Sequence, residues 1–99
     1  MKRNVEEGKA ILVDVRDLVE WNSGHVRDAI HLPWRDLQGK KSDQLVEKLP
    51  KDKIIYTYCA VGYRSYRAGK IVAKYKLDVR ALKPGFEDLV KAGFEPEKK

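Results

Sequence analysis

The sequence predicts a small α/β domain of three layers, in which helices flank a mainly parallel sheet of four to five strands. Short apolar stretches rich in β-branched residues alternate along the chain with stretches whose apolar residues have helical spacing. This alternation is typical of parallel sheets that helices cover on both faces. Because the chain has 99 residues, it has room for one hydrophobic core, and we expect a single domain over residues 1–99.

The strands are predicted at residues 11–15, 29–33, 53–58 and 79–82. The first reads Ile-Leu-Val-Asp-Val and is β-branched at three of its five positions, which favours a buried strand. Pro33 ends the second strand, since proline cannot continue the hydrogen-bonding ladder. The third strand has the strongest pattern, follows a turn at Pro50 and Asp52, and continues directly into Cys59.

Helical segments are predicted at residues 18–24, 34–49, 64–76 and 86–92. The first is a short helix or a turn, the second is interrupted near Gly39, and the last ends at Gly93 as a C-terminal cap. The buried faces of the second and third segments are predicted from helical spacing to contain Leu45, Val46, Leu49, Ala68, Ile71, Val72 and Tyr75. The charged tail at residues 95–99 is expected to be frayed.

The composition is that of an ordinary soluble globular protein, with 42% hydrophobic and 36% charged residues. Lys and Arg exceed Asp and Glu by 21 to 15, which gives a net charge of +6 at pH 7. Because the basic residues are scattered rather than clustered, we expect no nucleic-acid partner. The positive charge is instead expected to attract small anions.

The single cysteine cannot form a disulfide within the chain and suits a reducing compartment. Met1 is followed by Lys2 and Arg3 rather than by an apolar segment, and the longest apolar runs are far too short to cross a bilayer. We therefore expect a cytoplasmic monomer with no membrane partner. One cysteine and two distant histidines cannot complete a four-ligand metal site, so no metal and no other cofactor are expected.

Residues 59–65, Cys-Ala-Val-Gly-Tyr-Arg-Ser, are the segment that indicates chemistry. A strand ends at Cys59, a short loop follows, and a helix begins near Arg64. Backbone N–H groups at a helix start favour negative charge, so a loop that curls around Cys59 would stabilise its thiolate and lower its pKa. Gly62 suits a tight loop, and Arg64 adds a cation that binds oxyanions. The alternative is that Cys59 only fills space in the core.

Two blocks of residues resemble the rhodanese homology domain. They are Asp14-Val15-Arg16, Glu20-Trp21, Gly24-His25-Val26, Ala29 and Pro33 in the first, and residues 59–65 in the second. The resemblance extends over about residues 11–94. It implies a sulfurtransferase that takes sulfur from an anionic donor such as thiosulfate or polysulfide and passes it to cyanide, a thiol or a protein. It also implies that Cys59 carries the sulfur as a persulfide and that the donor and the persulfide are bound by Ala60, Val61, Gly62, Tyr63 and Arg64.

The chain departs from the family pattern at both ends. Only residues 1–10 precede the first predicted strand, where the family has about ten residues more that form an edge strand and a helix. Near the other end, Pro84 replaces one glycine of the Leu-x-Gly-Gly-aromatic pattern, and Leu89 lies where a Trp is common.

Asp14, Arg16, Glu20 and His25 are interpreted as a structural motif that organises loops. The alternative is a catalytic Cys-His-acid set, which needs a histidine within hydrogen-bond reach of the thiol. His31, Trp21 and Trp34 are likewise interpreted as packing or surface residues. Two other functions remain open: a non-catalytic rhodanese-like binding module, and a phosphatase or arsenate reductase, although that chemistry has Cys-x5-Arg and this chain has Cys-x4-Arg.

Overall fold

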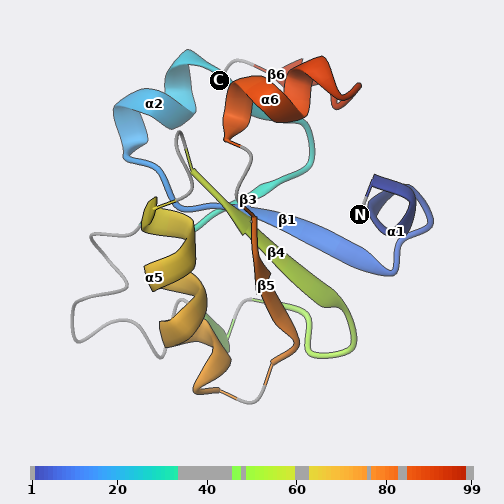
Figure 1. The fold of residues 1–99 in the computed structure, drawn as a ribbon, viewed down its shortest axis with the longest axis vertical. Coiled ribbons are helices and arrows are strands. Elements are labelled where there is room, and N and C mark those ends of the chain that lie inside the picture. Colours follow the sequence, from blue (N-terminus) through green and yellow to red (C-terminus); the bar gives the residue numbers. More distant parts are fainter. Residues whose placement is uncertain are drawn as a thin grey trace.

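A computed structural model describes residues 2–33, 46–47, 49–59, 63–75, 77–82 and 85–97 of the chain (Figure 1). In chain order the elements are α1 (Lys2–Glu6), β1 (Ala10–Asp14), α2 (Leu18–Ser23), β2 (His25–Val26), β3 (Ile30–His31), β4 (Ile54–Tyr58), α5 (Tyr63–Ala73), β5 (Val79–Ala81), α6 (Phe86–Lys91) and β6 (Pro96–Glu97).

The main sheet has four strands in the order β3–β1–β4–β5, and every neighbouring pair is parallel. Each of the four predicted strands overlaps one of them, so the α/β class and the parallel sheet are confirmed. The central strands β1 and β4 run in register from Ala10 opposite Ile54 to Asp14 opposite Tyr58. The carboxyl ends of these strands therefore lie together at one edge of the sheet.

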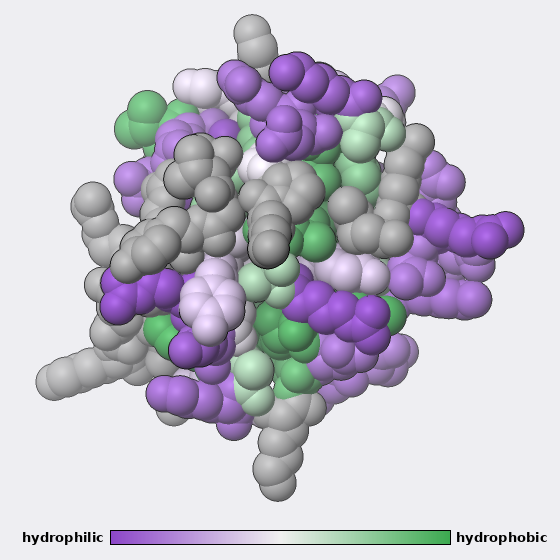
Figure 2. Space-filling model, in the orientation of Figure 1, coloured by the Kyte–Doolittle hydropathy of each residue, from purple (hydrophilic) through white to green (hydrophobic). Residues whose placement is uncertain are grey.

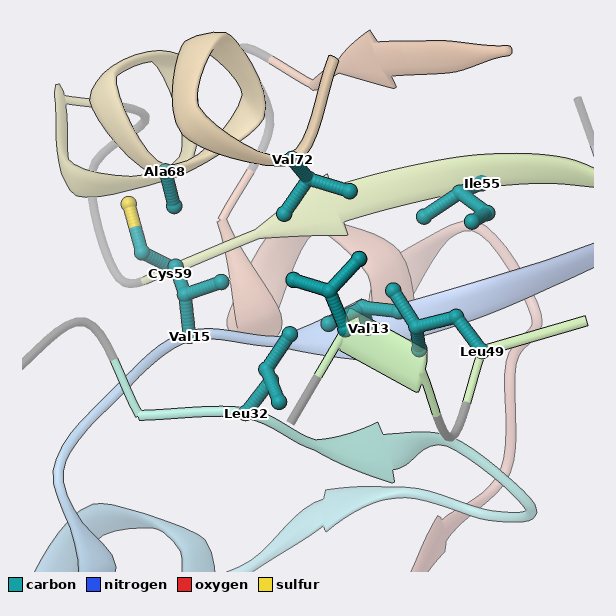
Figure 3. Close-up of a cluster of buried hydrophobic side chains, with 9 residues drawn as sticks. Val13, Val15, Leu32, Leu49, Ile55, Cys59, Ala68 and Val72 are labelled. Atoms are coloured by element: carbon teal, nitrogen blue, oxygen red, sulfur yellow. The ribbon is translucent and has the colours of Figure 1, made fainter. Parts of the chain in front are cut away.

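Side chains alternate between the two faces of the sheet, as the pleat of a strand requires. Val13 and Val15 contribute to one buried cluster, together with Ala68 and Val72 of α5 (Figure 3). Leu12 belongs to a second buried cluster, on the other face, which contains residues of α6 and is flanked by α1. These two clusters give the domain its three layers. The face of the molecule drawn in Figure 2 is mostly hydrophilic, with smaller hydrophobic areas between the polar side chains.

The structure adds an element at the N-terminus, where none was predicted, and corrects the prediction for the C-terminal tail. Residues before β1 form the short helix α1, and Val5 of this helix packs against the second cluster. The tail is not frayed over the described residues, because β6 pairs antiparallel with β2. The exposed ion pair between Arg27 and Glu95, at 2.9 Å, accompanies this pairing. The prediction for the tail is wrong because β2 and β6 have only two residues each, and strands this short have no recognisable periodicity in the sequence.

The helix predicted at residues 64–76 is α5, which ends earlier, at Ala73. Ala68 and Val72 are buried as predicted, but Tyr75 lies beyond the helix and is 37% exposed. Val46 and Leu49 are also buried as predicted. Residues 34–45 lie outside the described residues, so the predictions for Trp34, Gly39 and Leu45 stay predictions. Gly93 follows α6 with a φ of 110°, the conformation that a glycine cap supplies.

None of the helices in the described part of the chain is long and apolar enough to cross a membrane.

Two valines test the assignment of the core. Val13 is 0% exposed in the first cluster, whereas Val19 in α2 is 77% exposed. Val13→Ala removes two buried methyl groups and leaves a cavity, so we expect a loss of about 1–3 kcal/mol in the free energy of unfolding. Val19→Ala is the matched control and should change it by less than about 0.5 kcal/mol. Urea unfolding measures both, and equal losses would contradict the assigned core.

Candidate active site

Cys59 follows directly after β4, at the carboxyl edge of the sheet. The chain after the neighbouring strand β1 reaches the same edge, since the Val15 N–H donates to the Tyr58 carbonyl at 3.0 Å. In open α/β sheets, ligands bind beyond the carboxyl ends of the strands. The cysteine therefore lies where this class of sheet places its sites.

The thiol of Cys59 is 0% exposed and packs in the first cluster, close to Val15 and Ala68 (Figure 3). The backbone N–H of Ser65, in the first turn of α5, donates to Cys59 Sγ at 3.4 Å. This N–H and the positive end of the α5 dipole favour a negatively charged sulfur, while burial opposes it. Cys59 is thus a core residue whose sulfur atom also lies at the N-terminus of helix α5.

Two buried hydroxyl groups hold the Ser65 backbone in this position. The Thr57 hydroxyl of β4 donates to the Ser65 carbonyl at 2.9 Å. The Ser65 hydroxyl donates to the Leu82 carbonyl, just after β5, also at 2.9 Å. The first turn of α5 is therefore tied to two strands of the sheet. Sequence reasoning gave Thr57 and Ser65 no role, although a threonine in the apolar stretch 53–58 was a usable signal.

The predicted loop falls largely outside the described part of the chain. Ala60, Val61 and Gly62 are not described, and for Tyr63 and Arg64 the structure describes the backbone at the start of α5 but not the side chains. The role given to these five residues stays a prediction.

The predicted structural motif centres on Arg16, which is buried at the same edge of the sheet. Its Nε donates to both carboxylate oxygens of Asp14, at 3.1 and 3.0 Å, and its Nη2 donates to Asp14 Oδ2 at 2.8 Å. Nη2 also donates to the Gly24 carbonyl after α2. Burial lowers the pKa of Arg16, but the hydrogen bonds and charge of Asp14 outweigh it, so the pKa is raised overall.

Phe86 connects this ion pair to the cysteine. The Arg16 guanidinium carbon lies 4.4 Å from the centroid of the Phe86 ring, within cation–π range. The Phe86 backbone N–H donates to the Cys59 carbonyl at 2.9 Å. Gly24 lies against the same ring, since a Cβ there would be 3.4 Å from Phe86 Cζ. Arg16 therefore helps to position the Cys59 backbone through Phe86.

Tyr58 is a buried polar neighbour of this pair that sequence reasoning did not single out. Its hydroxyl accepts a hydrogen bond from the Val26 N–H at 3.1 Å. Burial raises the pKa of Tyr58, and the nearby Asp14 carboxylate raises it further. The phenol therefore stays neutral and links β4 to β2.

Glu20 and His25 have local structural contacts. Glu20 accepts a hydrogen bond from the Asp17 N–H at 3.2 Å as part of a capping box at the start of α2. His25 Nδ1 lies 2.9 Å from the Trp21 carbonyl oxygen, and its ring stacks on Trp21 at 3.5 Å. His31 also stacks on Trp21, at 4.6 Å, with Nε2 2.9 Å from the Arg16 carbonyl oxygen. The polar contacts described for the two imidazoles are thus with backbone carbonyls.

Comparison with known proteins identifies the family. The rhodanese-like domain matches residues 1–92, and the chain belongs to this family. The Alr3790 protein from Anabaena sp. superposes with a TM-score of 0.81 at 28% identity, covering 98% of this chain and 75% of that one. A rhodanese-related protein from Thermoplasma volcanium has the same fold, with a TM-score of 0.78 at 22% identity, covering 99% and 91% of the two chains.

Relatives among curated proteins include one that is named a sulfurtransferase, from Allochromatium vinosum, which is 33% identical over 67 residues. The match covers 68% of this chain and 58% of that protein. The uncharacterized protein YqhL of Bacillus subtilis is 34% identical over 80 residues, which are 80% of this chain and 60% of YqhL. The chain thus spans less than two thirds of either relative.

The Asp14–Arg16 pair gives a stability prediction. The Asp14 and Arg16 side chains are 0% and 7% exposed, so Arg16→Ala leaves a buried carboxylate without its partner. We expect a loss of about 3–5 kcal/mol in the free energy of unfolding, measured in urea. The Asp14→Ala/Arg16→Ala double variant should be more stable than Arg16→Ala alone, and Arg27→Ala, which removes an exposed pair, is the control. An Arg16→Ala protein as stable as the control would contradict the role given to Arg16.

Proposed function

We propose that the protein is a sulfurtransferase in which Cys59 carries sulfane sulfur between an anionic donor and a nucleophilic acceptor. The observation that supports this most directly is the Ser65 N–H at 3.4 Å from Cys59 Sγ, in the first turn of a helix at the carboxyl edge of the sheet. A sulfur that gains a negative charge there meets a backbone donor already in place. The relative from Allochromatium vinosum that bears the name sulfurtransferase supports the same activity.

In the first half of the proposed reaction, the Cys59 thiolate attacks the outer sulfur of the donor. With thiosulfate, a bond forms between Cys59 Sγ and that sulfur, the S–S bond of thiosulfate breaks, and its electron pair leaves with sulfite. The product is the persulfide anion on Cys59. We predict that the backbone N–H groups of the loop at Ala60, Val61, Gly62, Tyr63 and Arg64 bind this anion.

In the second half, the acceptor attacks the outer sulfur of the persulfide. With cyanide, a C–S bond forms, the S–S bond of the persulfide breaks, and its electron pair returns to Cys59 Sγ as the thiolate. Thiocyanate leaves. The Ser65 N–H then stabilises the leaving thiolate, and the proposed cycle needs neither a metal nor a histidine general base.

The persulfide is directly measurable. Thiosulfate or polysulfide should raise the intact mass by one sulfur, about 32 Da, located on Cys59. Cyanide should then remove this mass and release thiocyanate. Cys59→Ser is the control and should show neither the mass change nor turnover. If the native protein folds but its mass does not change with either donor, the proposal of sulfurtransferase activity is wrong, and the alternative of a non-catalytic binding module replaces it.

Arg64 is predicted to contribute to the binding of anionic donors. Removal of a charge-assisted contact costs roughly 1.5–3 kcal/mol, so Arg64→Ala should lower kcat/KM for thiosulfate by roughly 10- to 100-fold. Arg27→Ala removes the same charge from an exposed ion pair with Glu95 and should leave kcat/KM unchanged. Equal effects of the two substitutions would mean that only the net charge of the protein matters.

A further inference from the structure

A groove lies between helix α5 and strand β5, and none of the residues that line it belongs to the candidate active site. It has a volume of about 310 Å³ and is lined by Tyr66, Gly69, Lys70, Ala73, Val79 and Ala81. Gly69 makes the close packing beneath it possible, since a Cβ there would lie 3.4 Å from both Ala81 Cβ and Thr57 Oγ1. Figure 2 shows a hydrophobic area between hydrophilic side chains over this part of the molecule.

One wall of the groove is the edge of the main sheet. β5 pairs with β4, and no described strand pairs with its other side. The Leu82 N–H donates to the Thr57 carbonyl, and the Ile55 N–H donates to the Asp78 carbonyl. The residues on either side of β5 therefore direct these backbone groups toward β4. By strand alternation, the backbone N–H and carbonyl groups of Val79 and Ala81 point outward. An extended peptide binds to such an edge by adding a strand.

The other wall of the groove is helix α5, which presents a basic side chain, Lys70, to the groove. Residues 63–76 contain five basic residues, Arg64, Arg67, Lys70, Lys74 and Lys76, and no acidic residue. Lys70 lines the groove, with its Nζ 4.9 Å from the centroid of the exposed Tyr66 ring. The nearby Asp78 carboxylate forms an ion pair with Arg80 at 3.5 Å. The Lys70 ammonium in this wall therefore complements an acidic ligand.

One end of the groove is formed by Tyr66 and Ala81, which adjoin residues that hold Cys59. Ala81 is opposite Thr57 in the sheet, two residues before the cysteine. Tyr66 follows Ser65, the residue whose N–H contacts Cys59 Sγ and whose hydroxyl binds the Leu82 carbonyl. A chain that follows the groove toward its Tyr66 and Ala81 end is thus led to the sheet edge where the sulfur would be exchanged.

We infer that this groove binds an extended, acidic segment of a partner protein, whose thiol receives sulfur from Cys59. The inference rests on the proposed function. In the transfer, the partner's thiol sulfur bonds to the outer sulfur of the Cys59 persulfide, and the S–S bond breaks with its electron pair on Cys59 Sγ. The proton of the thiol ends on the transferred sulfur, and the partner leaves as a hydropersulfide.

The test uses a peptide of about ten residues, enough to span a short strand, with alternating Glu and Val and one terminal Cys. A second peptide has Lys in place of Glu. Binding is measured by fluorescence anisotropy on the Cys59→Ser protein, which needs no sulfur chemistry. Transfer is then measured on the native protein loaded with polysulfide, with dithiothreitol as a neutral small acceptor.

We expect the Glu peptide to bind and to accept sulfur at least about tenfold better than the Lys peptide, with a preference that falls as salt rises. Lys70→Glu and the groove-filling Ala73→Trp should abolish this preference and leave transfer to dithiothreitol within about twofold. Lys91→Glu is the control, because it makes an equal charge change on the exposed surface of α6. It should retain the preference for the Glu peptide.

The two hypotheses fail in different ways. A protein that gains no sulfur contradicts the proposed function, whether or not the peptide binds. A loaded protein that treats both peptides alike overturns the groove inference only. The inference is also overturned if Ala73→Trp converts a dimer to a monomer in sedimentation, which assigns the edge to a second copy, or if single-stranded RNA binds at Lys70 in preference to the Glu peptide.

Discussion

The buried guanidinium of Arg16 is the interaction on which the functional edge of the sheet depends. Its partners come from different segments: Asp14 ends β1, the Gly24 carbonyl follows α2, and the Phe86 ring begins α6. A buried cation is tolerated only where charge and hydrogen bonds compensate for the lost solvation. Its presence therefore requires these segments to converge, and Phe86 extends the constraint to the Cys59 carbonyl.

The cysteine is held from two independent directions. Phe86 binds its carbonyl, while Thr57 and Ser65 hydroxyl groups fix the first turn of α5 so that the Ser65 N–H meets the thiol. The contacts of Thr57 with Ser65 and of Ser65 with Cys59 are buried, and a site needs its donors in place before charge develops. The nucleophile is itself part of the core, so packing and proposed chemistry depend on the same residues.

Sequence reasoning predicted the sheet because β1 and β4 carry continuous apolar patterns, and it placed Cys59 correctly at a strand end. It assigned the Asp14–Arg16 motif to structure, and the ion pair supports that interpretation. It missed α1, the β2–β6 pair and Tyr58, since short elements have no periodicity and a tyrosine in a strand looks like any other apolar residue. The hydrogen bond between Thr57 and Ser65 was also missed. It joins a residue inside strand β4 to the first turn of helix α5, and only tertiary packing brings these two elements together.

The proposed chemistry depends on stabilisation of a negatively charged Cys59 sulfur by the Ser65 backbone N–H. The amide proton of Ser65, followed by NMR in isotopically labelled protein, tests this most directly. We expect this resonance to shift as the thiol loses its proton and to shift again when polysulfide loads Cys59, and we expect neither change in Cys59→Ser. A Ser65 resonance that does not shift while the protein gains a sulfur would contradict a role of this N–H in stabilising the sulfur.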